Sequence, residues 1–184
     1  MAAGLTLAGC SDDGDGTDAG PGSGDGSGGE HAVETDATLG KVRGELDDAR
    51  AAEALAAVTE VVDGWIDGGY AGDYPRGTFD EAFGAFTDDA RELALAQPAV
   101  MSNAEVGDRL EGAEVTQRSV SVDVLGVRGK PAGATAHVVL TVELEGGPDG
   151  TQRSDQVTGR LLLTPGKDGW RVFGFDVSRG EEGA

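Results

Sequence analysis

Apolar residues recur every three or four positions between about Asp47 and Asp67, which is the spacing of one face of an amphipathic helix. This face consists of Leu55, Val58, Val62, Trp65 and Ile66. Frequent alanine favours a helix here, and Asp47 and Asp48 suit the positive end of its dipole. Gly68 and Gly69 then end the pattern, so a single helix is predicted for this segment.

A second helix is predicted after the turn-rich residues 70–77. Thr78 is its expected N-cap, and Glu81 completes a capping box. Its inward stripe is Phe79, Phe83, Phe86, Ala90, Leu93 and Ala94. Pro98 ends this helix, and Val100 and Met101 suggest a shorter helical turn after it.

From about residue 112 the apolar period changes to two, which is typical of half-buried strands. Valine alternates with polar residues over 120–124, and alanine, valine and leucine alternate with polar residues over 134–144. A third strand is expected over about 151–164 and a last one over 170–177, with Gly-rich turns before each. Short turns between successive strands predict a four-stranded antiparallel meander with one buried face, which the two helices would cover.

Helices followed by such a meander, with a last strand of Trp-x-Val-x-Gly-Phe pattern, resemble the NTF2-like (cystatin-like) fold. The resemblance covers roughly residues 47–178 and rests on element order and a few aromatic positions. It implies an α+β domain in which N-terminal helices pack on a curved four-stranded antiparallel meander to form a cone. Residues 179–184 are expected to be a flexible tail.

The N-terminus carries the sequence Leu7-Ala8-Gly9-Cys10, which is similar to the lipobox of bacterial lipoproteins at all four positions. The resemblance implies that residues 1–9 are part of a signal peptide and that Cys10 carries a lipid on the extracytoplasmic face of the cell membrane. A signal peptide requires a positively charged start, but no Lys or Arg precedes Cys10. We therefore expect a longer reading frame upstream that supplies it. The alternative is a cytosolic protein with a free thiol.

Residues 10–46 are expected to form a disordered acidic spacer after the lipidated cysteine. Residues 11–36 contain eight acids, no Lys or Arg, and many glycines, so they bury too little apolar surface to offset the entropy of ordering. Asp13, Asp15 and Asp18 suggest a calcium loop, but Thr17 and Gly24 stand where that loop needs a ligand. No metal site is expected.

Charge and composition exclude several classes of function. The formal net charge is -20, which disfavours binding to nucleic acids because phosphate backbones are held by surplus Lys and Arg. A single cysteine excludes an internal disulfide, and no run approaches the roughly 20 apolar residues that cross a bilayer. Arginine far outnumbers lysine, which indicates a high-GC genome such as that of an actinobacterium.

Enzymes with ketosteroid-isomerase-like or cyclase chemistry on this fold use an Asp base and Tyr donors in an apolar cavity. Among Asp123, Asp155 and Asp176, only Asp155 shares the phase of buried strand positions, with Tyr70 and Tyr74 as possible donors. Because no second carboxylate is placed for acid–base roles, we predict no catalytic residues. His137 lies on the polar phase of its strand and His31 in the spacer, so neither is expected to bind metal.

A ligand site at the mouth of the cone is the sharper hypothesis for the aromatic residues. Its candidates are Trp65, Tyr70, Tyr74, Asp155 and Trp170. The plainer alternative is that the aromatic residues are core. The predicted function is a membrane-anchored module, without cofactor, that binds an envelope protein or a small apolar ligand. The alternatives are a cavity enzyme of isomerase or cyclase type and a passive envelope component.

Overall fold

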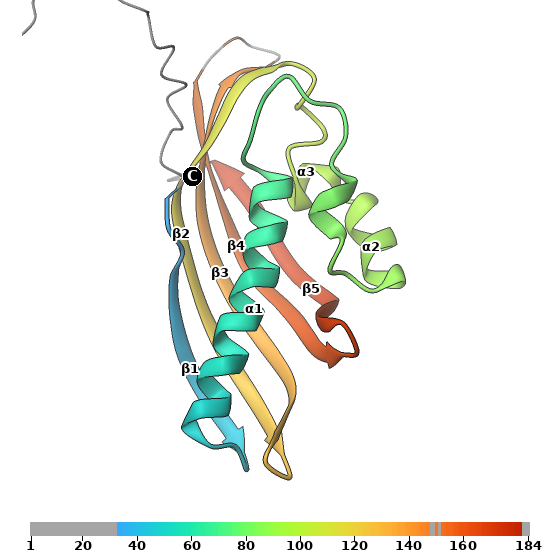
Figure 1. The fold of residues 1–184 in the computed structure, drawn as a ribbon. Coiled ribbons are helices and arrows are strands. Elements are labelled where there is room, and N and C mark those ends of the chain that lie inside the picture. Colours follow the sequence, from blue (N-terminus) through green and yellow to red (C-terminus); the bar gives the residue numbers. More distant parts are fainter. Residues whose placement is uncertain (1–32, 148–149, 151, 182–184) are drawn as a thin grey trace, which may run out of the picture. The chain divides into compact units, whose positions relative to one another are not determined.

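The computed structural model describes residues 33–147, 150 and 152–181. Within these ranges the chain forms one five-stranded sheet with its helices on one face (Figure 1). In chain order the elements are β1 (Asp36–Gly44), α1 (Asp48–Gly69), the 3-10 helix η1 (Asp80–Phe83), α2 (Asp88–Leu95), α3 (Pro98–Met101), β2 (Leu110–Val127), β3 (Lys130–Gly146), β4 (Arg153–Gly166) and β5 (Gly169–Glu181).

The predicted fold class is wrong, because the sheet is mixed and its first element is a strand. β2, β3, β4 and β5 pair antiparallel in sequence order, but β1 precedes every helix and pairs parallel to β2. The domain is therefore not a four-stranded antiparallel meander preceded by helices. β1 also occupies residues that the sequence analysis assigned to the spacer over 10–46.

β1 escaped prediction because it is an exposed edge strand without alternating apolar residues. Nearly all of its residues are exposed, including Leu39 and Val42 at 40% and 39%. Its register with β2 shifts between these two residues. At that bulge the backbone N–H of Lys41 donates to the carboxylate of Asp123 at 2.7 Å, which fixes the strand by a polar contact.

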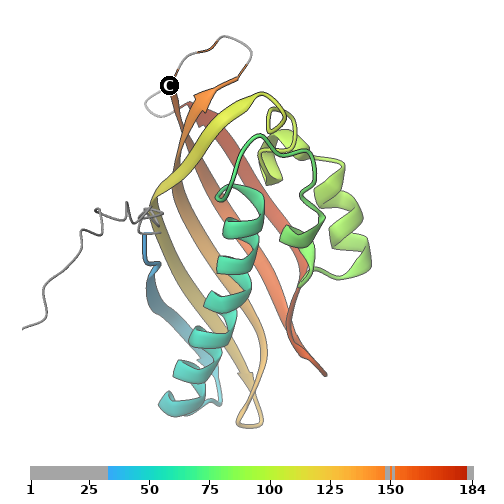
Figure 2. The same cartoon turned by 45° about the horizontal axis from the view of Figure 1, so that its top comes forward.

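The core lies between the sheet and the helices, as the strand alternation predicts. One row of inward side chains crosses β2 to β5 through Val122, Ala136, Leu161 and Phe175, and the exposed Leu39 of β1 pairs with Val122 at the edge of the sheet. In both views α1 runs along this face of a curved sheet, and α2 and α3 lie beside it over β5 (Figure 1, Figure 2). Burial of apolar side chains at this layer is the main stabilising contribution.

The first predicted helix is confirmed as α1. Asp47 is its N-cap and accepts a hydrogen bond from the backbone N–H of Arg50 at 2.8 Å. Val58, Val62 and Trp65 are fully buried, as the helical spacing predicts.

The second predicted helix is wrong at its start. Thr78 is exposed and caps nothing, and the chain instead forms the short η1 before α2 begins. Thr87 is the N-cap of α2 and accepts from Ala90 N at 3.4 Å. Leu93 was expected to face inward but is 57% exposed, whereas Ala90 and Ala94 of the same predicted stripe are buried.

Several predictions concern residues outside the described ranges. Cys10 with its lipid, the signal segment 1–9, the acidic cluster of Asp13, Asp15 and Asp18, and His31 all lie there. Among the residues that the structure describes, no helix has the length and apolar character needed to cross a membrane.

Candidate functional site

The C-terminal end of α1 anchors the short helix α3 through two aromatic side chains. The indole N–H of Trp65 donates to Met101 O at 3.0 Å, and the hydroxyl of Tyr70 donates to Val100 O at 2.5 Å. Both side chains are fully buried, and their rings meet edge to face at 5.5 Å. Their polar groups are therefore engaged with the backbone of α3.

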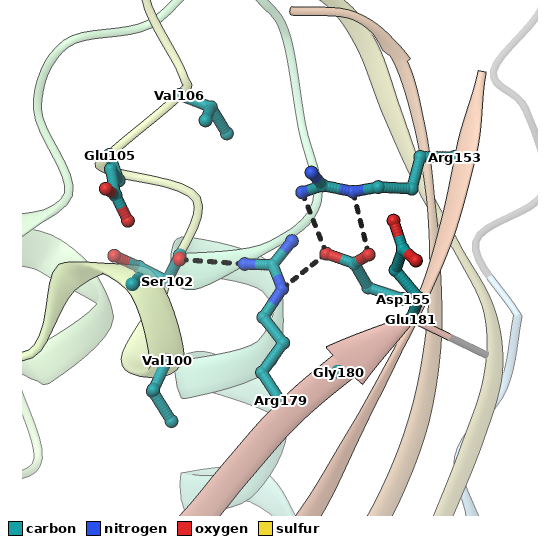
Figure 3. A pocket seen from close by; sticks show the side chains of 10 residues that line it. Val100, Ser102, Glu105, Val106, Arg153, Asp155, Arg179, Gly180 and Glu181 are labelled. Carbon is teal, nitrogen blue, oxygen red and sulfur yellow. Dashed lines mark hydrogen bonds and ion pairs between the residues drawn. The ribbon is translucent and has the colours of Figure 1, made fainter. Parts of the chain in front are cut away.

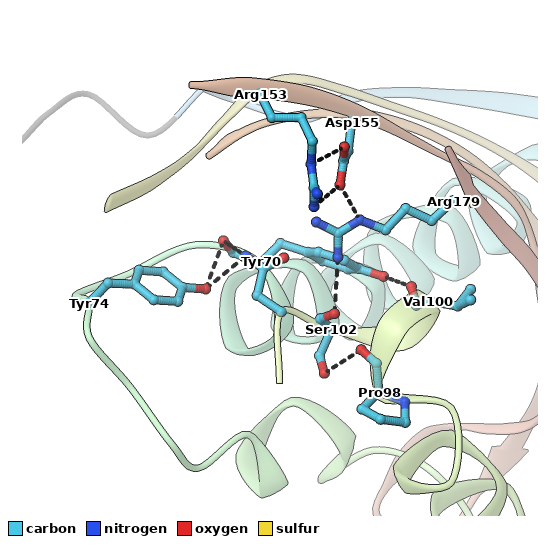
Figure 4. Close-up of polar contacts among 9 residues, drawn as sticks. Tyr70, Tyr74, Pro98, Val100, Ser102, Arg153, Asp155 and Arg179 are labelled. Carbon is cyan, nitrogen blue, oxygen red and sulfur yellow. Dashed lines mark hydrogen bonds and ion pairs between the residues drawn. The ribbon is translucent and has the colours of Figure 1, made fainter. Parts of the chain in front are cut away.

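Asn103 joins the segment after α3 to the segment after α1. Its side-chain amide donates to Tyr70 O at 3.0 Å and to the hydroxyl of Tyr74 at 2.8 Å. The Tyr74 hydroxyl in turn donates to Tyr70 O at 3.2 Å. These bonds hold Tyr74 half-buried beside Tyr70 (Figure 4).

Tyr70 is kept neutral by its surroundings. Burial raises the pKa of its hydroxyl far above the usual range, and the positive charge of Arg179 lowers the pKa by a smaller amount. The Arg179 guanidinium carbon lies 5.7 Å from the centroid of the Tyr70 ring. Tyr70 thus provides an aromatic surface beneath a buried cation.

A cluster of three charged side chains lies above Tyr70, where β4 begins and β5 ends. Asp155 is 3% exposed and accepts from Arg179 Nε at 2.7 Å through Oδ2. Arg153 contacts both oxygens of the same carboxylate, with Nε 2.8 Å from Oδ1 and Nη2 3.0 Å from Oδ2. Arg179 also donates through Nη1 to Ser102 O at 3.1 Å, which links β5 to the end of α3 (Figure 4).

Strand register brings this cluster to the helix-covered face. Asp155 pairs with Val142 of β3, and Arg179 pairs with Val157 of β4. Both valines are fully buried, so the charged side chains share the inward face with them. A buried carboxylate needs a charged partner, and Arg179 with a 7% exposed side chain is that partner.

An open pocket of about 290 Å³ lies over this cluster (Figure 3). Its lining combines apolar and charged residues: Ala99, Val100, Ser102, Glu105, Val106, Arg153, Asp155, Arg179, Gly180 and Glu181. The two glutamates are exposed and lie at its rim, whereas Asp155 and Arg179 are buried at its base.

The structure places the sequence-predicted site residues in three different ways. Asp155 points inward, as its strand phase predicts, and lines the pocket. Trp65, Tyr70 and Tyr74 cluster behind the pocket rather than lining it. Trp170 pairs with Pro165 beside the β4–β5 turn, at the opposite end of the hairpin, and packs against the core.

The other carboxylates considered as bases lie away from the pocket. Asp176 is exposed and pairs with Arg160 at 3.1 Å, and Asp123 faces the same outer side of the sheet as His137. The backbone N–H of Lys41 holds the pKa of Asp123 below its usual range, with a smaller contribution from His137. His137 is half-exposed and 3.7 Å from the Asp123 carboxylate.

Sequence reasoning missed Arg153, Arg179 and Ser102. Arg179 was left out because the domain was ended at residue 178, whereas β5 runs to Glu181. Its position two residues after Val177, on the inward phase of β5, was the available signal. Ser102 contributes a backbone carbonyl, which no sequence pattern marks.

A second, shallower groove of about 390 Å³ lies between β1 and α1. It is lined by Ala37, Ala52, Leu55, Ala56, Thr59, Glu60 and Asp63. Its lining holds no ionic pair like that of Asp155 and Arg179, so it offers less chemistry to orient a ligand.

Within the described part of the chain, no group of three His, Cys, Asp or Glu side chains could hold a metal ion. No protein-family model, curated protein or solved structure matches this chain. The resemblance to lipoproteins with an NTF2-like domain therefore stays a prediction.

Proposed function

We propose that this chain is a lipid-anchored extracytoplasmic protein whose domain is a non-catalytic module that binds a small ligand. The observation that carries the binding role is the pocket built over the buried Asp155–Arg179 pair. Ligand sites are typically concave, partly apolar, and equipped with a few fixed polar groups. This pocket has those properties, and its charged base is held by hydrogen bonds from three elements.

The arrangement favours binding over isomerase or cyclase chemistry. A general base needs a carboxylate oxygen that can reach the substrate proton. Both oxygens of Asp155 are held by guanidinium groups, at 2.7 to 3.0 Å. The Tyr70 hydroxyl, the expected donor, is directed to Val100 O.

The binding role is tested by screening the full chain against a mixed library of neutral, cationic and anionic small molecules. The readout is the rise in melting temperature that a bound ligand produces. Ala99 is exposed and lines the pocket, so Ala99→Trp should block the pocket without disturbing the core. Ala96→Trp is the matched control, because Ala96 is also exposed and lies outside the lining. Hits that Ala99→Trp abolishes and Ala96→Trp retains support the proposal, and a screen without such hits contradicts it.

The location rests on Cys10 in its Leu-Ala-Gly-Cys context. The test expresses the gene from its own locus, with its upstream DNA, in cells fed a clickable fatty acid. We expect the label on the native protein and on Ser11→Ala, and none on Cys10→Ala. An unlabelled native protein, or one recovered in the cytosolic fraction, would refute the anchor.

A further inference from the structure

We infer that the pocket over Asp155 and Arg179 binds the carboxylate of a small monoanionic compound with an apolar body. This inference rests on the proposed binding function and names its ligand class. Its basis is one atom of Arg179. Nε donates to Asp155 and Nη1 donates to Ser102 O, but Nη2 is buried and has no partner among the described residues.

An unpartnered nitrogen on a buried guanidinium is costly unless something accepts its hydrogen bond. The Arg179 side chain is 7% exposed, and the pocket adjoins its guanidinium (Figure 3). A ligand oxygen that reached Nη2 would complete the hydrogen bonds of Arg179, and because this atom is closed to solvent, the lining has to shift to admit it. A negatively charged oxygen would do so most strongly, because hydrogen bonds between ions are the strongest of this kind.

The local charges limit the negative charge that a ligand can carry. Arg153 and Arg179 together carry two positive charges at the base of the pocket, and Asp155 neutralises one of them. Among these three side chains one positive charge is left over, while Glu105 and Glu181, the cross-strand partner of Asp155, add two exposed negative charges to the lining. A ligand held against the two guanidinium groups can therefore carry at most one negative charge.

The residues at the rim and walls of the pocket further restrict the chemical class of the ligand. Glu105 and Glu181 are exposed at the rim, so a dianion such as phosphate would meet two negative charges on entry. Ala99, Val100 and Val106 provide an apolar wall. The volume of about 290 Å³ suits a compound of a few carbon atoms. A short monocarboxylate combines these features.

Three probes of similar size test this inference on the full chain. Butyrate carries the carboxylate, butyramide replaces it with a neutral amide, and inorganic phosphate carries more charge without an apolar body. Titrations followed by proton–nitrogen NMR of the arginine side chains should show saturable shifts with butyrate. We expect butyramide and phosphate to bind roughly tenfold more weakly or worse, since a hydrogen bond to a charged group is lost or opposed.

Variants localise the binding. Arg179→Lys keeps the charge but removes Nη2, and should weaken butyrate binding roughly tenfold. Arg153→Gln changes a half-exposed side chain and is the second variant in which butyrate binding is measured, in case Arg179→Lys does not fold. Arg160→Lys, in the exposed pair with Asp176 on the outer face, is the matched control and should bind butyrate normally.

The results separate the ligand class from the binding function. Equal binding of butyrate and butyramide, tighter binding of phosphate, or butyrate binding insensitive to Arg153→Gln would each overturn the carboxylate assignment. Absence of butyrate binding overturns it too. The binding function survives any of these results if the library screen yields ligands whose binding Ala99→Trp abolishes and Ala96→Trp retains, and it fails when the screen yields no such ligand.

Discussion

Replacing Asp155 with asparagine should destabilise the domain more than any surface substitution. The change keeps the shape of the side chain and removes its charge. Arg179, with a side chain only 7% exposed, would then hold a buried positive charge without its closest counter-charge. Breaking a buried pair in this way costs about 3–5 kcal/mol, so we expect the free energy of unfolding to fall by that amount.

Arg153→Gln is the matched comparison, because Arg153 contacts the same carboxylate from a half-exposed position. Its side chain is 42% exposed, so solvent already screens its interaction with Asp155. Asp155 also keeps its bond to Arg179 in this variant. We therefore expect a loss of about 1 kcal/mol or less.

Urea unfolding of the full chain at neutral pH, followed by circular dichroism, measures both losses without adding salt. Similar losses for Asp155→Asn and Arg153→Gln would refute the reasoning, because Arg179 would then not depend on a buried counter-charge. The double variant Asp155→Leu with Arg179→Met should recover much of the loss, since apolar pairs can replace buried ion pairs. A double variant as unstable as Asp155→Asn would assign the loss to packing instead.

Three further predictions concern the rest of the domain. Because burial raises the pKa of Tyr70, the unfolded chain loses the hydroxyl proton at a lower pH than the folded chain does. The free energy of unfolding should therefore fall as pH rises above about 10. In urea titrations from pH 9 to 11, Tyr70→Phe should show a shallower fall. Because the Lys41 N–H lowers the pKa of Asp123, Asp123→Asn should speed amide hydrogen exchange in β1 at pH 7. The difference in exchange rate between this variant and the native chain should fade as pH falls below about 4. An unchanged exchange rate at pH 7 would argue against this contact. Thr87→Ala should cost about 1 kcal/mol in urea unfolding, whereas Thr78→Ala should cost little, and the reverse order would restore the capping box predicted from the sequence.

Elements with a strong apolar period could be predicted from the sequence, and those without one could not. α1 and the antiparallel pairing of β2 to β5 follow from periods of about four and two with short turns. β1 has no such period, because it lies at the sheet edge and is held by backbone pairing and by Asp123. A contact of residues 82 positions apart leaves no local pattern.

The second helix shows how a correct core prediction can accompany a wrong element. Phe79, Phe83 and Phe86 are all buried, as their spacing suggested. The spacing of three and four residues fits a continuous helix. Phe83 and Phe86 also fit a 3-10 helix followed by a turn, with their rings edge to face at 5.3 Å. Thr87 followed by two aspartates suits a helix start as well as Thr78 does, so local sequence does not distinguish them. Tertiary packing favours the start at Thr87.

Counting forward from the β4–β5 turn places Arg179 on the wrong face, because β5 contains a bulge, and only a count from Val177, beyond the bulge, places it correctly. Leu163 pairs with Val172 and Leu162 pairs with Gly174, so Phe173 is an extra residue on β5, and it is 52% exposed. Before the bulge the inward residue is Val172, and after it the inward residues have odd numbers and include Arg179. Bulges re-aim side chains and are frequent beside functional sites. If Phe173 instead took a regular place in the ladder, the even-numbered residues after Val172 would stay on the inward face. Ser178 and Gly180 would then face inward, and Arg179 would lie on the outer face. Asp155 would then be buried with only the half-exposed Arg153 as its partner, so the bulge is what supplies the cation at the base of the pocket.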